Sequence, residues 1–257
     1  VQHVFFFRII VSNKRVSRKV SSMALVSVPQ WVEQSAAVMV DLDGTMVDTL
    51  GDFAKAVELM LQDLKLPAID AALIENMVGK GSEHLLQSVL THVLDKAGVE
   101  SAAAQASALL PAALDSYQKH YEQINGQFSR VYPGVIEGLD GLKQRGLRLA
   151  CLTNKPTAFA IELLQAKGLG GYFECVFGGD SFERKKPDPM PLLKTCEALG
   201  TTPANTLMLG DSSNDASAAR AAGCKVVLVT YGYNHGEPIR GVDADGFVDS
   251  FEELLGR

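Results

Sequence analysis

Two aspartates, Asp41 and Asp43, are the residues of this 257-residue chain whose type and spacing most directly suggest chemistry. They follow the apolar run Ala-Ala-Val-Met-Val at 36–40, which predicts a strand buried on both faces of a sheet. Because a carboxylate is unfavourable to bury without a partner, two of them at the end of such a strand indicate a metal ion, a cluster of donors or a catalytic role. The alternative is that both acids cap the next helix. Gly44 and Thr45 come next, and the Thr45 hydroxyl is expected to face the same edge.

Alternating strands and helices are expected to position these acids. Strands are predicted at 147–154, 174–179, 206–211, 225–229 and, weakly at an edge, 246–248, and helices at 134–143, 156–167, 191–199 and 215–222. Such alternation predicts an α/β fold with a Rossmann-like parallel sheet that is covered by helices on both faces. Functional residues of such a sheet lie at the carboxyl ends of its strands.

The residues between the first strand and residue 128 follow a helical rhythm. Helices are predicted at about 52–61, 69–77, 83–94 and 101–125, and Pro111 is expected to break the last stretch or to start a helix there. Because this block is inserted after the first strand, it should lie over that edge of the sheet as a cap. The predicted organisation is an N-terminal extension at 1–30, an α/β core domain formed by 31–50 and 129–257, and an α-helical cap domain at 51–128.

The N-terminal extension is basic. Residues 1–22 contain five Arg and Lys residues and no acid, which is typical of a targeting segment. The favoured interpretation, however, is that they are upstream translation and that Met23 is the true start. On that interpretation residues 1–22 are expected to be dispensable for activity.

The composition excludes several classes of function. The formal charge is −6, and it becomes −11 without the five positive charges of residues 1–22, so the body lacks the basic character of a general nucleic-acid binder. No apolar stretch approaches the roughly 20 residues that span a bilayer. The four cysteines are scattered without zinc spacing, which favours a reducing, cytoplasmic location. The expected partner is therefore a small molecule rather than nucleic acid or a membrane. The expected oligomeric state is a monomer or a homodimer.

Polar residues follow four predicted strands, whose carboxyl ends would bring them together. After the first pair of aspartates, these residues are Thr153, Asn154 and Lys155, then Asp180 with the loop at 184–189, and finally Asp211 and Asp215. Each group alone has an ordinary explanation, such as a helix cap or a solvated loop. Their occurrence in order on successive strands indicates one site.

This ordered set of motifs resembles the haloacid dehalogenase (HAD) superfamily of phosphotransferases, from residue 37 to about 255. The resemblance implies that Asp41 is a nucleophile that attacks phosphorus to give an aspartyl-phosphate. It implies that Asp43 is the general acid for the leaving alcohol and then the base that activates water. It also implies a Mg²⁺ ion held by Asp41, the backbone carbonyl of Asp43 and Asp211, since oxygen ligands suit that hard ion.

The same resemblance implies further roles at the site. The residues that would bind the substrate phosphoryl group are Thr45, Thr153 and Asn154. Lys186 would neutralise the developing charge, with Lys185 as the alternative for that role. Asp215 would lie behind them and orient metal-bound water or Lys186.

The position of the helical insert resembles a type of cap that closes over the site, excludes water and reads the leaving group. Within it, Gly79-Lys80-Gly81 is the candidate substrate loop. Its glycines would allow backbone amides to approach an anion, and Lys80 would bind a carboxylate. The alternative is an ordinary helix–helix turn with a solvated lysine.

Four segments, 78–81, 185–193, 210–224 and 230–239, are in addition similar to those of bacterial phosphoglycolate phosphatases. This resemblance implies a small phosphorylated metabolite, 2-phosphoglycolate, as the substrate. The chain departs from the pattern with Lys80 in place of an expected Asn and Asp188 in place of a common His. The alternatives are the same chemistry on an amino-sugar or other sugar phosphate, a phosphonatase with a Schiff-base lysine (Lys55, Lys65 or Lys80), and a non-enzymatic binding protein with this fold.

Overall fold

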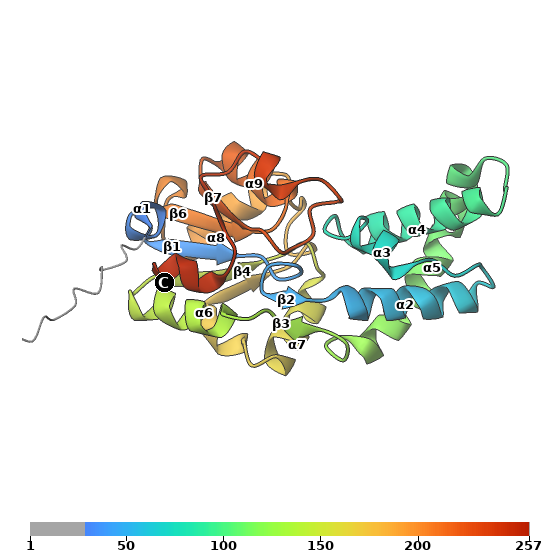
Figure 1. Ribbon diagram of the computed structural model, residues 1–257, viewed down its shortest axis with the longest axis horizontal. Coiled ribbons are helices and arrows are strands. Elements are labelled where there is room, and N and C mark those ends of the chain that lie inside the picture. The colour runs from blue at the N-terminus through green and yellow to red at the C-terminus, as the bar shows by residue number, and fades with distance from the viewer. Residues whose placement is uncertain (1–28, 257) are drawn as a thin grey trace, which may run out of the picture.

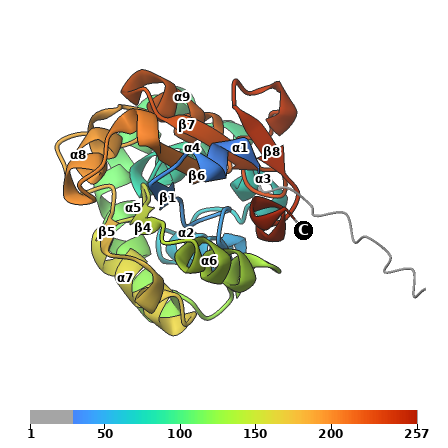
Figure 2. The same cartoon turned by 90° about the vertical axis from the view of Figure 1, so that its left-hand side faces the viewer.

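A six-stranded parallel sheet forms the centre of the molecule (Figures 1 and 2). The computed structural model describes residues 29–256, so the expectations for residues 1–22, and for nearly all of the 1–30 extension, lie outside the described residues. The strands lie in the order β5-β4-β1-β6-β7-β8 and every neighbouring pair is parallel. Their bounds are Ala37–Val40 (β1), Arg148–Leu152 (β4), Cys175–Phe177 (β5), Thr206–Gly210 (β6), Lys225–Val229 (β7) and Gly246–Val248 (β8). The predicted α/β sheet is confirmed, including its weak edge strand.

Alternate residues of the strands face opposite layers of helices. In β1, Val38 and Val40 pack with α6 and α7, whereas Met39 packs with α8 and α9. Figure 2 shows these two pairs of helices on opposite faces of the sheet. The helices of the core are α1 (Gln30–Glu33), α6 (Val135–Gln144), α7 (Thr157–Ala166), α8 (Met190–Ala198) and α9 (Ser213–Ala222), with short 3₁₀ helices at Gly170–Tyr172, Pro203–Asn205, Ile239–Gly241 and Phe251–Leu255. All four residues of β1 are fully buried, as expected of a strand covered on both faces.

A helical block follows β1 and packs around an apolar cluster of its own. Its helices are α2 (Leu50–Asp63), α3 (Ala71–Glu75), α4 (Ser82–Lys96) and α5 (Ala102–Ile124), which extend away from the sheet on the right of Figure 1. Helix α5 contacts both α2 and α4, and Tyr233 of the core joins the same cluster. Among the described helices, none is both long and apolar enough to cross a membrane.

The prediction that Pro111 breaks or starts a helix was wrong. Helix α5 runs without interruption from Ala102 to Ile124, with Pro111 inside it. A proline within a helix leaves the carbonyl four residues earlier, here that of Ser107, without its usual N–H donor. Because Ser107 and Pro111 both lie on the exposed face, water can hydrate that carbonyl, and the packed face of α5 is unaffected.

The chain leaves the core and returns to it through a two-stranded antiparallel ribbon that sequence analysis did not predict. Its strands are β2 (Val47–Asp48) and β3 (Arg130–Val131). Beside it, the fully buried carboxylate of Asp52 accepts hydrogen bonds from the backbone N–H groups of Gly126 (2.9 Å) and Phe128 (2.6 Å). One side chain at the start of the block therefore fixes the segment through which the chain returns.

Replacing Asp52 with Ala is expected to lower the free energy of unfolding by about 3 kcal/mol, since two backbone donors would lose charged acceptors in a buried place. Chemical denaturation of the purified variant measures this change. The matched control is Asp70→Ala, which removes an exposed aspartate that accepts from the backbone N–H of Ala72 at the start of α3. That change should cost about 1 kcal/mol or less. Equal effects of the two substitutions would contradict the bracing role of Asp52.

Candidate active site

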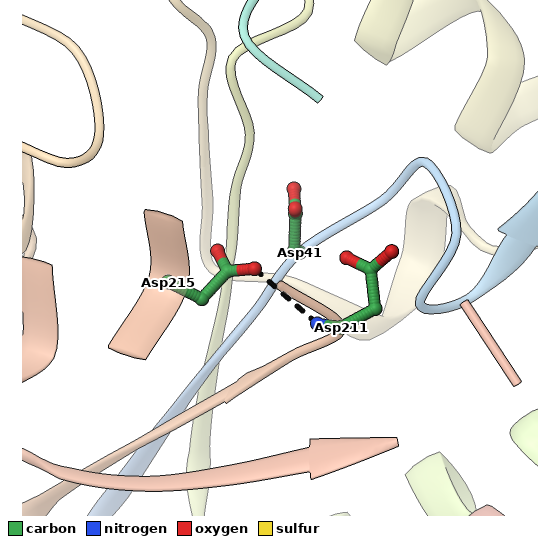
Figure 3. A group of neighbouring side chains, drawn as sticks. All are labelled: Asp41, Asp211 and Asp215. Atoms are coloured by element: carbon green, nitrogen blue, oxygen red, sulfur yellow. Dashed lines mark hydrogen bonds between the residues drawn. The ribbon is translucent and has the colours of Figure 1, made fainter. Parts of the chain in front are cut away.

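Three carboxylates that are distant in sequence meet at the carboxyl edge of the sheet. Asp41 follows β1, Asp211 follows the neighbouring strand β6, and Asp215 lies in the first turn of α9. One carboxylate oxygen of each lies within 4.8 Å of those of the other two. Figure 3 shows the three side chains, with the backbone N–H of Asp211 donating to Asp215 (3.2 Å). The strand-end positions anticipated from sequence do converge.

Lys186 supplies a positive charge to this cluster. Its buried ammonium lies 3.1 Å from Asp41 Oδ1 and 2.7 Å from Asp215 Oδ1, and it donates to the carbonyl of Leu152 (2.8 Å). Burial alone would lower the pKa of Lys186, but the two carboxylates outweigh it and hold the pKa above its usual value. Lys185, the alternative considered from sequence, instead lines an outer cleft.

Asp41 is held at the floor of the site. Its Oδ1 accepts from the backbone N–H of Leu42 (2.8 Å) as well as from Lys186, whereas Oδ2 accepts no hydrogen bond from residues 29–256. Burial raises the pKa of Asp41 to about 7, although Lys186 acts in the opposite direction. The fold therefore leaves Oδ2 of Asp41 without a hydrogen bond from the described residues. Burial disfavours the ionised carboxylate of Asp41, and a bound cation would offset that effect.

Asp211 is oriented by two donors. Thr45 Oγ1 donates to its Oδ1 (3.1 Å), and the backbone N–H of Tyr233 donates to its Oδ2 (2.6 Å). A Cβ atom at Gly44, whose φ is +81°, would lie only 2.2 Å from Asp211 Oδ2, so only glycine fits there. Burial raises the pKa of Asp211 well above its usual value. Thr45, which was expected to bind substrate, thus contacts a carboxylate of the cluster.

Asp215 supports the site from α9. Its Oδ2 accepts from the Ser212 hydroxyl (2.8 Å) and from the backbone N–H groups of Ser212 and Asp211 (3.2 Å each). The contact with the Ser212 N–H is one half of a capping box at the start of α9, and the Ser212 side chain completes it by accepting from the backbone N–H of Asp215. Because its Oδ1 is bonded to Lys186, the side chain can position that ammonium without being exposed itself.

The residues present fit a divalent cation. Three buried carboxylates, those of Asp41, Asp211 and Asp215, face the single ammonium of Lys186, so the cluster carries an excess of negative charge. Burial, and to a lesser degree the neighbouring carboxylates, raise the pKa of both Asp41 and Asp211. Carboxylate oxygens are the donors that hard divalent cations such as Mg²⁺ prefer.

A cavity of about 50 Å³ adjoins the carboxylates and lies between the core and the helical block. The core side is lined by Asp41, Asp43, Thr153, Asn154, Lys155, Pro156 and Phe159, and the block side by Phe53, Val78, Gly79, Gly81, Ser82, Leu85, Tyr117, Gln118 and Tyr121. Lys80 is not one of the described residues that line this cavity, although Gly79 and Gly81 on either side of it are. A single water needs at least about 10–15 Å³ of such space, so the cavity holds only a few water-sized groups.

The loop around Gly79 is docked on the core. The backbone carbonyl of Gly79 accepts hydrogen bonds from Asn154 Nδ2 and from Asn214 Nδ2, each at 3.2 Å. Asn154 also donates to the carbonyl of Lys186 (2.9 Å), and the Thr153 hydroxyl accepts from the backbone N–H of Lys155 (3.2 Å). Thr153 and Asn154 therefore reach the cavity as expected, and Asn154 contacts the block in addition.

Two further residues of the site were not assigned a role from sequence. Lys155, noted only as a neighbour of Thr153 and Asn154, donates to Asp43 Oδ1 (3.1 Å) and to the hydroxyl of Tyr121. Tyr121 lies in α5, and its apolar neighbours predict only a buried helix face. The position of Lys155 directly after the Thr-Asn pair was the available signal.

Known proteins are similar to this chain over most of its length. The family model of the haloacid dehalogenase-like hydrolases matches residues 38–229. A phosphoglycolate phosphatase of Thiobacillus denitrificans is 45% identical over 217 residues, which are 84% of this chain and 92% of that protein. A phosphoglycolate phosphatase of Nitrosospira multiformis is 46% identical with the same coverage. The crystal structure of a predicted phosphoglycolate phosphatase from Haemophilus somnus superposes with a TM-score of 0.80 and 34% identity, over 86% of this chain and 97% of that one.

Proposed function

Because the chain belongs to the haloacid dehalogenase-like hydrolases and is a phosphatase, we propose that it hydrolyses 2-phosphoglycolate to glycolate and phosphate with the help of Mg²⁺. The observation that carries the choice of substrate is the similarity to phosphoglycolate phosphatases, two of which are 45% and 46% identical to this chain over 217 residues. The cavity above Asp41 and Asp43, with Lys155 in its lining, is where the leaving group would lie.

In the proposed reaction, a carboxylate oxygen of Asp41 forms a bond to phosphorus while the bond from phosphorus to the glycolate oxygen breaks. Asp43 gives its proton to the departing oxygen, then removes a proton from water as that water attacks the aspartyl-phosphate. Phosphate leaves and Asp41 is regenerated. Lys186 neutralises charge on the phosphoryl oxygens, and Asp215 positions Lys186. Thr153 and Asn154 bind the phosphoryl group, whereas Thr45 orients Asp211.

Mg²⁺ would be held by Asp41, the backbone carbonyl of Asp43 and Asp211. When bound, it would offset the carboxylates and the negative charge of the phosphoryl group. The helical block at 51–128 is proposed as the cap domain, with 31–50 and 129–257 as the core domain, because the cavity lies between them and the block packs around its own cluster. The cap would exclude water from Asp41 and contact the leaving group.

The test is phosphate release from 2-phosphoglycolate, amino-sugar 6-phosphates, hexose phosphates and p-nitrophenyl phosphate, with Mg²⁺ and with a chelator. We expect kcat/KM to be highest for 2-phosphoglycolate and turnover to disappear with the chelator. A preference for a sugar phosphate would leave the chemistry in place but contradict the substrate. Absence of turnover on the whole panel would contradict the catalytic roles.

The thermal stability of the metal-free protein should fall as the pH rises from about 5 to about 7.5. Burial raises the pKa of Asp41 from its ordinary 3.8 to about 7, so in this range the folded state keeps a proton that the unfolded state has lost. Raising the pH then favours the unfolded state. Mg²⁺ would replace that proton as the compensating charge, so it should raise the melting temperature more at pH 7.5 than at pH 5. A Mg²⁺ shift that is the same at both pH values would argue against this account.

A further inference from the structure

Lys155 occupies an unusual place for a lysine. It follows β4, is only 5% exposed and lines the cavity above the carboxylates. Its ammonium lies 3.1 Å from Asp43 Oδ1, donates to the hydroxyl of Tyr121, and sits 4.7 Å from the ring centres of both Phe53 and Tyr121. The two rings favour a cation by the electrostatics of their faces. The surroundings therefore maintain a buried positive charge within an otherwise largely apolar chamber.

Among the described residues, Lys155 is the only cationic side chain that lines this cavity. Lys186 lies beneath Asp41, and its three N–H donors are directed to Asp41, Asp215 and the carbonyl of Leu152. An ammonium has three donors. Asp43 Oδ1 and Tyr121 account for two of those of Lys155, and the third reaches Asp43 Oδ2 at 3.5 Å, a long contact that a ligand oxygen in the cavity can replace.

The position of Lys155 relative to Asp43 indicates what that ligand is. In the proposed reaction Asp43 protonates the oxygen that leaves phosphorus. In 2-phosphoglycolate the carboxylate is attached to the carbon that carries this oxygen. A group that contacts Asp43 is therefore well placed to contact the substrate carboxylate as well, and Lys155 Nζ is 3.1 Å from Asp43. At the corresponding place a sugar phosphate carries carbon and hydroxyl groups, which do not need a buried cation.

We propose that Lys155, from the core, is the specificity-determining residue that binds the carboxylate of the leaving group. This inference rests on the proposed function. It differs from the expectation that Lys80 of the cap reads the carboxylate. A charge-assisted contact in a water-poor cavity gives strong discrimination against a neutral group of the same shape.

The experiment compares 2-phosphoglycolate with its amide, 2-phosphoglycolamide, which has nearly the same shape and no carboxylate charge. The measured quantity is the ratio of kcat/KM for the acid to kcat/KM for the amide. In Lys155→Met this ratio should fall roughly 10- to 100-fold, mainly through a higher KM for the acid. Lys155→Arg, which keeps the charge, should retain most of the ratio. Lys155→Gln, which is polar but uncharged, should lose it and provides a second neutral variant if the Met variant does not fold.

The ratio separates recognition from a merely positioning role of Lys155. If Lys155 only orients Asp43, its loss would slow both substrates equally, because Asp43 acts on both, and the ratio would stay unchanged. Lys143→Met is the matched control, since Lys143 also lies over an aromatic ring (5.5 Å from the centre of Tyr172) but is exposed, lies in the last turn of α6 before β4 begins, and does not line the cavity. It should leave the ratio as in the native enzyme.

The outcomes are distinguishable. A native enzyme that does not prefer the acid to the amide would contradict the proposed substrate itself. A native enzyme that does prefer the acid, together with neutral Lys155 variants that retain the ratio, would overturn only the role of Lys155. A fall of the ratio in Lys80→Met instead would return that role to the cap loop.

Discussion

Asp41→Asn should abolish turnover, with kcat at least about 10⁴-fold below that of the native enzyme. An amide oxygen is too weak a nucleophile to attack phosphorus, so no aspartyl-phosphate can form. The fold should persist, because Asn has the same shape and Lys186 keeps its contacts with Asp215 and the carbonyl of Leu152. Since burial disfavours the charge of Asp41, the metal-free variant should be at least as stable as the native protein above pH 7.

The measurement combines steady-state kinetics, thermal melting and mass spectrometry of acid-quenched enzyme. Native enzyme mixed with substrate should carry a phosphoryl group on the peptide that contains Asp41, and Asp41→Asn should not. Asp140→Asn is the control, because Asp140 is an exposed acid of α6 that accepts a hydrogen bond from Tyr172 and does not line the cavity. Turnover retained in Asp41→Asn would remove Asp41 from the role of nucleophile.

Asp43→Asn should separate the two halves of the reaction. Loss of the general acid should lower kcat for 2-phosphoglycolate by about 10²- to 10⁴-fold. p-Nitrophenolate leaves without needing a proton, so with p-nitrophenyl phosphate the first half should remain fast. The water that attacks the aspartyl-phosphate would then lack its general base, Asp43, so the aspartyl-phosphate should accumulate. The metal should still bind, since Asp43 would contribute only its backbone carbonyl.

Rapid-mixing absorbance with p-nitrophenyl phosphate measures this directly. We expect a burst of about one p-nitrophenolate per active site, followed by slow turnover. The Asp41→Asn variant serves as the negative control and should show no burst. Equal loss of both phases in Asp43→Asn, or unchanged turnover of 2-phosphoglycolate, would assign the acid–base role to another group.

The sheet could be predicted because its signals are local. Each strand is a short apolar run that ends in polar residues, and each is followed by a stretch with helical periodicity. The ribbon formed by β2 and β3 could not be predicted, since two residues per strand contain no periodicity and the partners lie far apart in sequence. The prediction of a helix break or start at Pro111 was wrong for a related reason. Whether a proline breaks a helix depends on the exposure of the carbonyl that loses its donor, which the sequence alone does not reveal.

The carboxylates and Lys186 could be anticipated because they follow strands in order, and parallel strands bring their ends together. The surroundings of Lys155 could not. Its contact with Asp43 spans 112 residues and its contact with Tyr121 spans 34, and neither partner has a pattern that points to the other. The same limit applies to Lys80, whose placement relative to the cavity depends on how the Gly79 carbonyl is held by Asn154 and Asn214.

Tyr233 is one of several core residues that are hydrogen-bonded to the helical block or to its start. Its backbone N–H binds Asp211, while its hydroxyl accepts from the N–H groups of Thr49 and Leu50, where the chain enters the helical block. A single residue is thus bonded both to a carboxylate of the acidic cluster and to the start of α2. Because coupling between two binding equilibria is reciprocal, we expect a movement of α2 that alters the Asp211 carboxylate to change the affinity of the cluster for a cation, and cation binding to shift the position of the helical block by the same free energy.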